Sequence, residues 1–145
     1  MTLTLHDIKV WNTGEVIDLI VPSDADETVD ASAMTIAPGF EDPHVHFRDP
    51  GQTYKESMVS GCAAAASGGY TNVLIMPNTV PAMDGVKVTA GEPGASEVLD
   101  AGFDTVIDYL QHYEQAHDVT LPVRYDLCVC CLLYTSPSPR DVEES

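Results

Sequence analysis

The fold is decided by residues 38–51, which read Pro38-Gly39-Phe40-Glu41-Asp42-Pro43-His44-Val45-His46-Phe47-Arg48-Asp49-Pro50-Gly51. Side chains on a β-strand alternate between its two faces, so His44 and His46 share one face, and Arg48 joins them if the strand continues. Val45 and Phe47 point to the opposite face, where we expect an apolar layer to cover them. The Pro-Gly pair at the end then stops the strand and turns the chain.

The residue types on that face indicate a chemistry. Two imidazoles so placed can hold one divalent metal ion, and His is the commonest protein ligand for such ions. A guanidinium two residues further on offers a fork of donors for a carboxylate. The His-x-His pair alone is a weak signal, because five His in 145 residues give about 0.17 such pairs by chance. A metal beside an anion clamp at one strand end is typical of a hydrolase.

The context of the pair is far more specific. The pattern Asp42-x-His44-x-His46-x-Arg48-Asp49-Pro50-Gly51 resembles the first-strand signature of the amidohydrolase superfamily. Its details are similar to those of dihydroorotases, more than to those of hydantoinases or allantoinases. A second matching piece, Met76-Pro77-Asn78-Thr79, follows at the expected distance. The resemblance covers roughly residues 3–131 and implies a small β subdomain followed by a TIM-type (β/α) barrel.

The resemblance also implies an activity and roles for the site residues. A dihydroorotase hydrolyses dihydroorotate reversibly to N-carbamoyl-aspartate in de novo pyrimidine (UMP) biosynthesis, using one or two zinc ions. By resemblance His44 and His46 bind zinc, His46 also lines the substrate pocket, and Arg48 and Asn78 bind the substrate carboxylate. Asp42 either supports the ligand strand or shapes the turn. The other metal ligands and the general base come from later strands, so we expect no catalytic base here and an inactive fragment.

Two other readings stay open at this point. Within the superfamily, the chain is alternatively an allantoinase or hydantoinase type of cyclic amidohydrolase. Outside enzymes, it is alternatively a non-catalytic amidohydrolase-like scaffold protein. Arg48 and the Met-Pro-Asn-Thr piece disfavour the first alternative, and the intact His pair disfavours the second.

We expect an α/β chain in three parts. Residues 1–37 are predicted to form the N-terminal part of a small β-sandwich subdomain, with strands over 3–10, 16–21 and 28–37. Residues 38–131 are predicted to form the first two to three βα units of a truncated, partial barrel. Residues 132–145 contain Ser-Pro repeats and a charged end, and are predicted to be a disordered or foreign tail.

Within the barrel segment the sequence predicts a βαβ unit. A helix is expected over 54–67, with Thr53 as N-cap, Glu56 at the capping-box spacing, and Gly68 at its end. The other expected elements are a strand over 70–76 buried on both faces, a long connection over 79–103, an amphipathic helix over 104–117 and a third strand over 123–130.

The composition of the chain excludes some classes of binding partner. The net charge of −17 argues against nucleic acid and against anionic membrane surfaces, and no apolar run reaches the roughly 20 residues of a membrane span. The resemblance to dihydroorotases implies a small-molecule substrate, dihydroorotate or N-carbamoyl-aspartate, and is compatible with a homodimer in a full-length form. Four Cys are too few and too unevenly placed for a disulfide framework, which favours the cytoplasm.

The remaining Cys and His residues carry no predicted role in the site. Cys62 is expected to be a core residue. The run Cys128-x-Cys130-Cys131 is read as core packing rather than as a metal site, because no second Cys or His pair completes it. The other three His, at positions 6, 112 and 117, are expected to be solvated.

Overall fold

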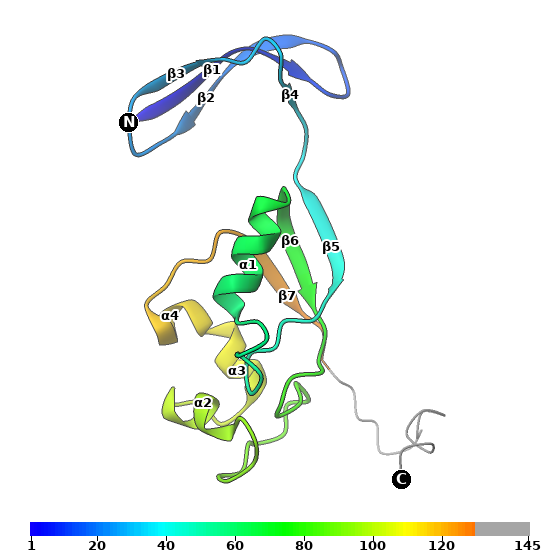
Figure 1. Ribbon diagram of the computed structural model, residues 1–145, viewed down its shortest axis with the longest axis vertical. Helices are drawn as coiled ribbons and strands as arrows, with labels where there is room; N and C mark the ends of the chain where they lie inside the picture. Colours follow the sequence, from blue (N-terminus) through cyan, green and yellow to red (C-terminus); the bar gives the residue numbers. More distant parts are fainter. Residues whose placement is uncertain (130–145) are drawn as a thin grey trace, which may run out of the picture. The chain divides into compact units, whose positions relative to one another are not determined.

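The computed structural model describes residues 1–129, which form two compact units, Met1–Gly39 and a second one that begins at Phe40. Strands dominate the first unit, and strands and helices alternate in the second, which confirms an α/β chain (Figure 1). The expected tail over 132–145, Cys130 and Cys131 lie outside the described residues. Within residues 1–129, the helices are all too short or too polar to span a bilayer.

The first unit is a four-stranded sheet built around β1 (Thr2–Val10). Strand β2 (Val16–Pro22) pairs with it antiparallel, while β3 (Glu27–Asp30) and β4 (Thr35–Ile36) pair with it in parallel. The first two strands therefore lie where the sequence predicts them.

The single strand expected over 28–37 is broken in two. The carboxylate of Asp30 accepts a hydrogen bond from the Ser32 backbone N at 3.0 Å, and the Met34 N donates to the Ala31 carbonyl at 2.8 Å. These bonds form a turn in place of strand pairing. The neighbouring strand β1 is irregular opposite this turn, with Asp7 at φ 60° inside a bulge. Strand pairing is therefore interrupted on both sides.

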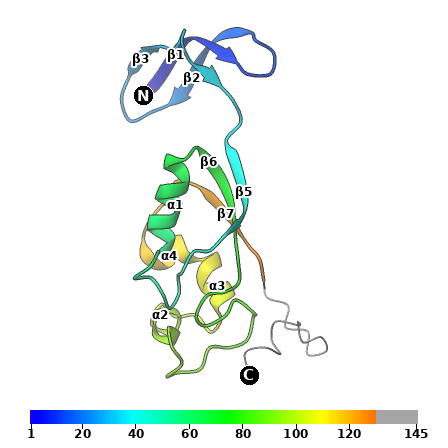
Figure 2. The ribbon, with the colours of Figure 1, turned by 45° about the vertical axis from the view of Figure 1, so that its right-hand side comes forward.

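The second unit contains a parallel three-stranded sheet in the order β5-β6-β7. Its strands are β5 (Phe40–Val45), β6 (Tyr70–Ile75) and β7 (Arg124–Leu127). Helix α1 (Met58–Ser67) connects β5 to β6 and lies against one face of the sheet (Figure 2). The predicted strand–helix–strand unit and the third strand are both present.

A hydrophobic core fills the space between α1 and the sheet. Met58 and Cys62 of the helix pack there with Val73 and Ile75 of β6, all fully buried, so Cys62 is the core residue that the sequence predicts. Phe47 packs on the same core.

The prediction that the strand over 70–76 is buried on both faces is wrong in part. Val73 and Ile75 are the buried residues of β6, whereas Thr71 on their face is exposed and Leu74 on the other face is half-buried.

Helix α1 begins later than predicted. Ser57, not Thr53, is its N-cap: the Ser57 hydroxyl accepts from the Ser60 N, and the Ser60 hydroxyl accepts in return from the Ser57 N. Residues 51–55 form turns, and the buried carboxylate of Asp49 accepts from the Met58 N at 3.3 Å. This tertiary contact sets the helix start, while Gly68 ends the helix as expected.

The connection between β6 and β7 contains three short helices. Helix α2 (Ala95–Asp100) lies in a segment where no regular structure was expected. The helix predicted over 104–117 is divided into α3 (Val106–Gln111) and α4 (Tyr113–His117). At the break, His112 leaves the helical region with φ −114° and ψ 18°, and its Nδ1 donates to the Asp108 carbonyl at 2.9 Å. The His112 backbone N donates to the same carbonyl at 3.2 Å, and α3 ends at this residue.

Candidate functional site

Two imidazoles meet where β5 ends. The Nε2 atoms of His44 and His46 lie 3.2 Å apart, and the ring centroids lie 5.0 Å apart with nearly perpendicular planes. Both side chains are exposed. The rings therefore share one side of the chain, as strand alternation predicts, although β5 itself stops at Val45. Phe47, by contrast, is buried in the core, on the side opposite to the His pair.

Asn78 joins this pair from the next strand. It follows the C-terminal end of β6, and its Oδ1 lies 2.8 Å from the Nδ1 of His46. An amide oxygen can only accept, so the Nδ1 of His46 carries the proton and the Nε2 of His46 presents its lone pair toward His44. Three of the four predicted site residues thus form one hydrogen-bonded group.

Arg48 forms no hydrogen bond with that group among the described residues. It follows the end of β5, which is Val45. Its side chain is half-buried, and within residues 1–129 its guanidinium forms no hydrogen bond or ion pair. Its backbone is held on both sides: the N donates to the Glu56 carbonyl at 3.2 Å, and the carbonyl accepts from the Gln52 N at 2.8 Å.

Asp42 acts on the backbone of the ligand strand. Its Oδ1 accepts from the His44 backbone N at 3.0 Å, a contact that shapes the chain where the first imidazole projects. Asp42 and His46 also line one pocket of about 390 Å³. In the part of the chain that the structure describes, no three His, Cys, Asp or Glu side chains gather closely enough to hold a metal. Among the predicted site residues, His44 and His46 are the two whose ring nitrogens lie close together.

A buried polar cluster lies behind the loop that follows Arg48, and sequence reasoning missed it. Asp49 is only 2% exposed, and its carboxylate accepts from the Tyr109 hydroxyl at 3.1 Å and from the Tyr113 hydroxyl at 2.9 Å. The Nε2 of His117 lies 2.9 Å from the Tyr109 oxygen. Burial, with the Asp49 charge as the next cause, raises the pKa of both tyrosines well above their usual value.

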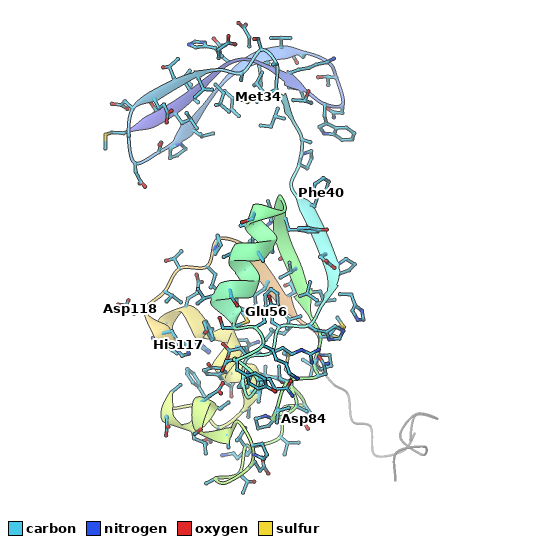
Figure 3. The ribbon with its side chains drawn as sticks, viewed as in Figure 1. Met34, Phe40, Glu56, Asp84, His117 and Asp118 are labelled. Atoms are coloured by element: carbon cyan, nitrogen blue, oxygen red, sulfur yellow. The ribbon has the colours of Figure 1, made fainter. Side chains whose placement is uncertain are left out.

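One signal in the sequence could have indicated the cluster. Tyr109, Tyr113 and His117 recur at intervals of four, the spacing that stacks side chains on one helical face, even though the helix breaks at His112. His117, which Figure 3 labels, is exposed as the sequence predicts, and its Nε2 is in addition hydrogen-bonded to the Tyr109 hydroxyl. His112 likewise stacks on the Phe103 ring, with centroids 5.6 Å apart.

Comparisons with known proteins agree with the local pattern. Residues 35–93 match the Amidohydrolase family. The chain is 60% identical over 62 residues to a dihydroorotase of Sulfurihydrogenibium, an alignment that covers 43% of this chain and 15% of that protein. It is 36% identical over 118 residues to a dihydroorotase of Lactococcus lactis, covering 73% of this chain and 28% of the relative. A Geobacter metallireducens dihydroorotase is 46% identical over 89 residues, covering 52% and 21%. The chain thus spans less than a third of the length of these curated relatives.

Proposed function

Because this chain carries an amidohydrolase segment and is similar in sequence to dihydroorotases, we propose that it forms part of a dihydroorotase, which hydrolyses dihydroorotate reversibly to N-carbamoyl-aspartate. In this proposal β5, β6 and β7 are the first strands of a TIM-type barrel, whose active site lies at the C-terminal ends of its strands. The observation that carries the proposal is the meeting of His44, His46 and Asn78 at that edge of the sheet.

The geometry of the two imidazoles fits a zinc ion. In a tetrahedral site with Zn–N distances of about 2.0–2.1 Å, two ligand nitrogens lie about 3.3 Å apart. The Nε2 atoms of His44 and His46 are separated by 3.2 Å. The lone pair of His46 is already directed into the space between the rings, because Asn78 holds the proton of that ring on Nδ1. We propose that the pair supplies two zinc ligands and that the remaining ligands come from beyond residue 129.

Bound zinc would lower the pKa of water to near 7 and polarise the carbonyl of the cyclic amide. The residues of this chain would bind and orient the substrate. The amide oxygen of Asn78 is engaged by His46, which leaves its NH₂ group to donate to the substrate carboxylate. Arg48 would provide the charged partner of that carboxylate, as a two-pronged donor.

The local charge of Arg48 outweighs the charge of the chain as a whole. The substrate is an anion and the formal net charge of the chain is −17, so long-range attraction is unfavourable. At physiological salt the Debye length is about 8 Å, so distant carboxylates are largely screened, whereas a contacting guanidinium is not.

The experiment is a paired assay of metal content and turnover. A complete dihydroorotase that carries this segment is purified, its zinc is measured, and its hydrolysis of dihydroorotate is compared with that of hydantoin and allantoin. We expect bound zinc, preference for dihydroorotate, and loss of both zinc and turnover in His44→Ala and His46→Ala. His6→Ala is the control, since that exposed His lies in the first unit beside Asp18.

The outcomes separate the competing functions. Preference for hydantoin or allantoin would replace the proposed substrate within the same superfamily. Absence of zinc from the purified protein would point instead to a non-catalytic scaffold. The 145-residue chain on its own is expected to show no turnover, because its described residues bring only two metal ligands together.

A further inference from the structure

We propose that Asp49 is a positioning residue for Arg48: its buried carboxylate anchors the loop that starts at Arg48 to the helices behind it, and so fixes where the guanidinium meets the substrate carboxylate. This inference rests on the proposed function. It concerns a residue beside the site rather than in it, since Asp49 faces the core and not the His pair.

Asp49 is bound from three directions. Its two oxygens accept from the hydroxyl of Tyr109 on α3, the hydroxyl of Tyr113 on α4, and the backbone N of Met58 at the start of α1, at 3.1, 2.9 and 3.3 Å. Because the Tyr109 hydroxyl donates to Asp49, the Nε2–H of His117 donates to Tyr109 and extends the chain of bonds. A buried carboxylate with three donors is held firmly, because releasing any donor leaves its charge less satisfied.

The residues that follow Asp49 are fixed as well. The Gly51 backbone N donates to the carboxylate of Glu97 on α2 at 2.9 Å. The Pro50 carbonyl accepts from the Val80 N at 3.3 Å, which ties this loop to the segment immediately after Asn78. The two residues proposed to share the substrate carboxylate, Arg48 and Asn78, are therefore attached to one cross-linked pair of loops.

Arg48 itself depends on this anchor. Its guanidinium forms no hydrogen bond or ion pair within residues 1–129, so its placement comes from its backbone and from the loop that continues into Asp49. A displacement of about 1 Å in a group that orients the substrate is enough to weaken catalysis strongly. Weakening the hydrogen bonds of Asp49 should therefore raise the KM for the substrate. It should do so only in a protein that still has Arg48.

A double-mutant cycle in a complete, zinc-loaded dihydroorotase carrying this segment tests that dependence. We expect Asp49→Asn to raise the KM for dihydroorotate about tenfold, with kcat and zinc content nearly unchanged. In an Arg48→Ala background the same substitution should change kcat/KM by less than about twofold, because the group it positions is gone. Tyr113→Phe should shift KM in the same direction by about threefold, without removing the carboxylate.

Tyr125→Phe is the matched control. The Tyr125 hydroxyl donates to the Leu110 carbonyl on α3, so this variant removes one tyrosine hydrogen bond from the same core without touching Asp49. Its KM should equal that of the parent. If Asp49→Asn fails to fold, the double-mutant cycle is measured with Tyr113→Phe in place of Asp49→Asn, with and without Arg48→Ala.

Four results would count against the inference. Equal losses of kcat/KM from Asp49→Asn with and without Arg48 would show a general structural role, as would an equal KM shift in Tyr125→Phe. A fall in kcat at constant KM would place Asp49 in the chemistry rather than in positioning. A parent protein without turnover of dihydroorotate would overturn the proposed function, and this inference with it.

Discussion

Gly51 and Val80 are in backbone contact: a Cβ atom added to Gly51 would lie 1.8 Å from the Val80 carbonyl oxygen. Gly94 lies against the same carbonyl, where its own Cβ would come within 2.0 Å. Both glycines also have positive φ angles, 89° and 75°. The loops after β5 and β6 and the start of α2 are therefore packed backbone to backbone, at a distance that only glycine allows.

Gly51→Ala is expected to destabilise the protein by about 3 kcal/mol or more, because the methyl group adds overpacking to the cost of a left-handed conformation. Urea denaturation followed by circular dichroism measures the loss. Gly102→Ala is the matched control, since Gly102 has a φ of 88° but nothing within 4 Å of its added Cβ. The control should lose only about 1–2 kcal/mol, the conformational cost alone. Equal losses in the two variants would contradict the close contact.

Arg48→Lys in a complete enzyme should lower kcat/KM for dihydroorotate by a factor equivalent to about 1.5–3 kcal/mol, the value of a hydrogen bond to a charged group. Lysine keeps the charge but loses the planar fork that matches a carboxylate. Steady-state kinetics give the ratio. Arg124→Lys on β7 makes the same exchange at an exposed position and should have no effect. An unchanged kcat/KM in Arg48→Lys would remove this residue from the site.

Asn78→Asp separates the two tasks proposed for this side chain. A carboxylate still accepts from the Nδ1 of His46, so zinc should be retained. The substitution removes the NH₂ donor and adds a negative charge facing the substrate carboxylate, so KM should rise more than tenfold. Zinc analysis and kinetics on one preparation check both statements. Asn12→Asp, in an exposed turn of the first unit, should alter neither, and loss of zinc in Asn78→Asp would show that the amide is needed for the metal.

Alkaline pH should destabilise the second unit. Burial raises the pKa of the Cys62 thiol from 9.0 to about 11 and, as the largest cause, that of the Tyr125 hydroxyl from 10.0 to about 12. The folded state thus keeps protons that the unfolded state releases above pH 9. The free energy of unfolding should therefore be constant below that pH and fall continuously as the pH rises toward 11.

Urea titrations at a series of pH values up to 10.5 would follow this loss. Tyr125→Phe removes one of the shifted groups, so its unfolding free energy should fall less steeply above pH 10 than that of the parent. A free energy of unfolding that stays level across this range would mean that these groups are accessible to water in the folded protein.

Short-range patterns predict much of this structure. The alternation around His44 and His46 places the two imidazoles together, and the apolar run over 70–76 becomes a parallel strand beside β5. Parallel pairing then places the Pro-Asn corner after that run at the same edge of the sheet as His46, where Asn78 Oδ1 lies 2.8 Å from His46 Nδ1. These features depend on strand periodicity and on parallel pairing, which a single sequence expresses directly.

The features that were missed depend on contacts between distant residues. The start of α1 is set by Asp49, which accepts from the Met58 N while two tyrosines from beyond residue 100 hold it. The break between α3 and α4 falls at His112, whose ring stacks on that of Phe103, outside both helices. Rules for helix capping consider only residues that are close in sequence. They cannot predict the role of Asp49, whose partner Tyr109 is 60 residues away.

The bond between His46 and Asn78 gives the two imidazoles unequal readiness for a cation. The ring of His46 already has its free electron pair on Nε2, so it can accept an ion without any rearrangement. At the 3.2 Å separation of the two Nε2 atoms, the hydrogen between them then belongs to His44. In the proposed zinc site, His44 would therefore have to move its hydrogen off Nε2 before that nitrogen could bind the ion, whereas His46 would not.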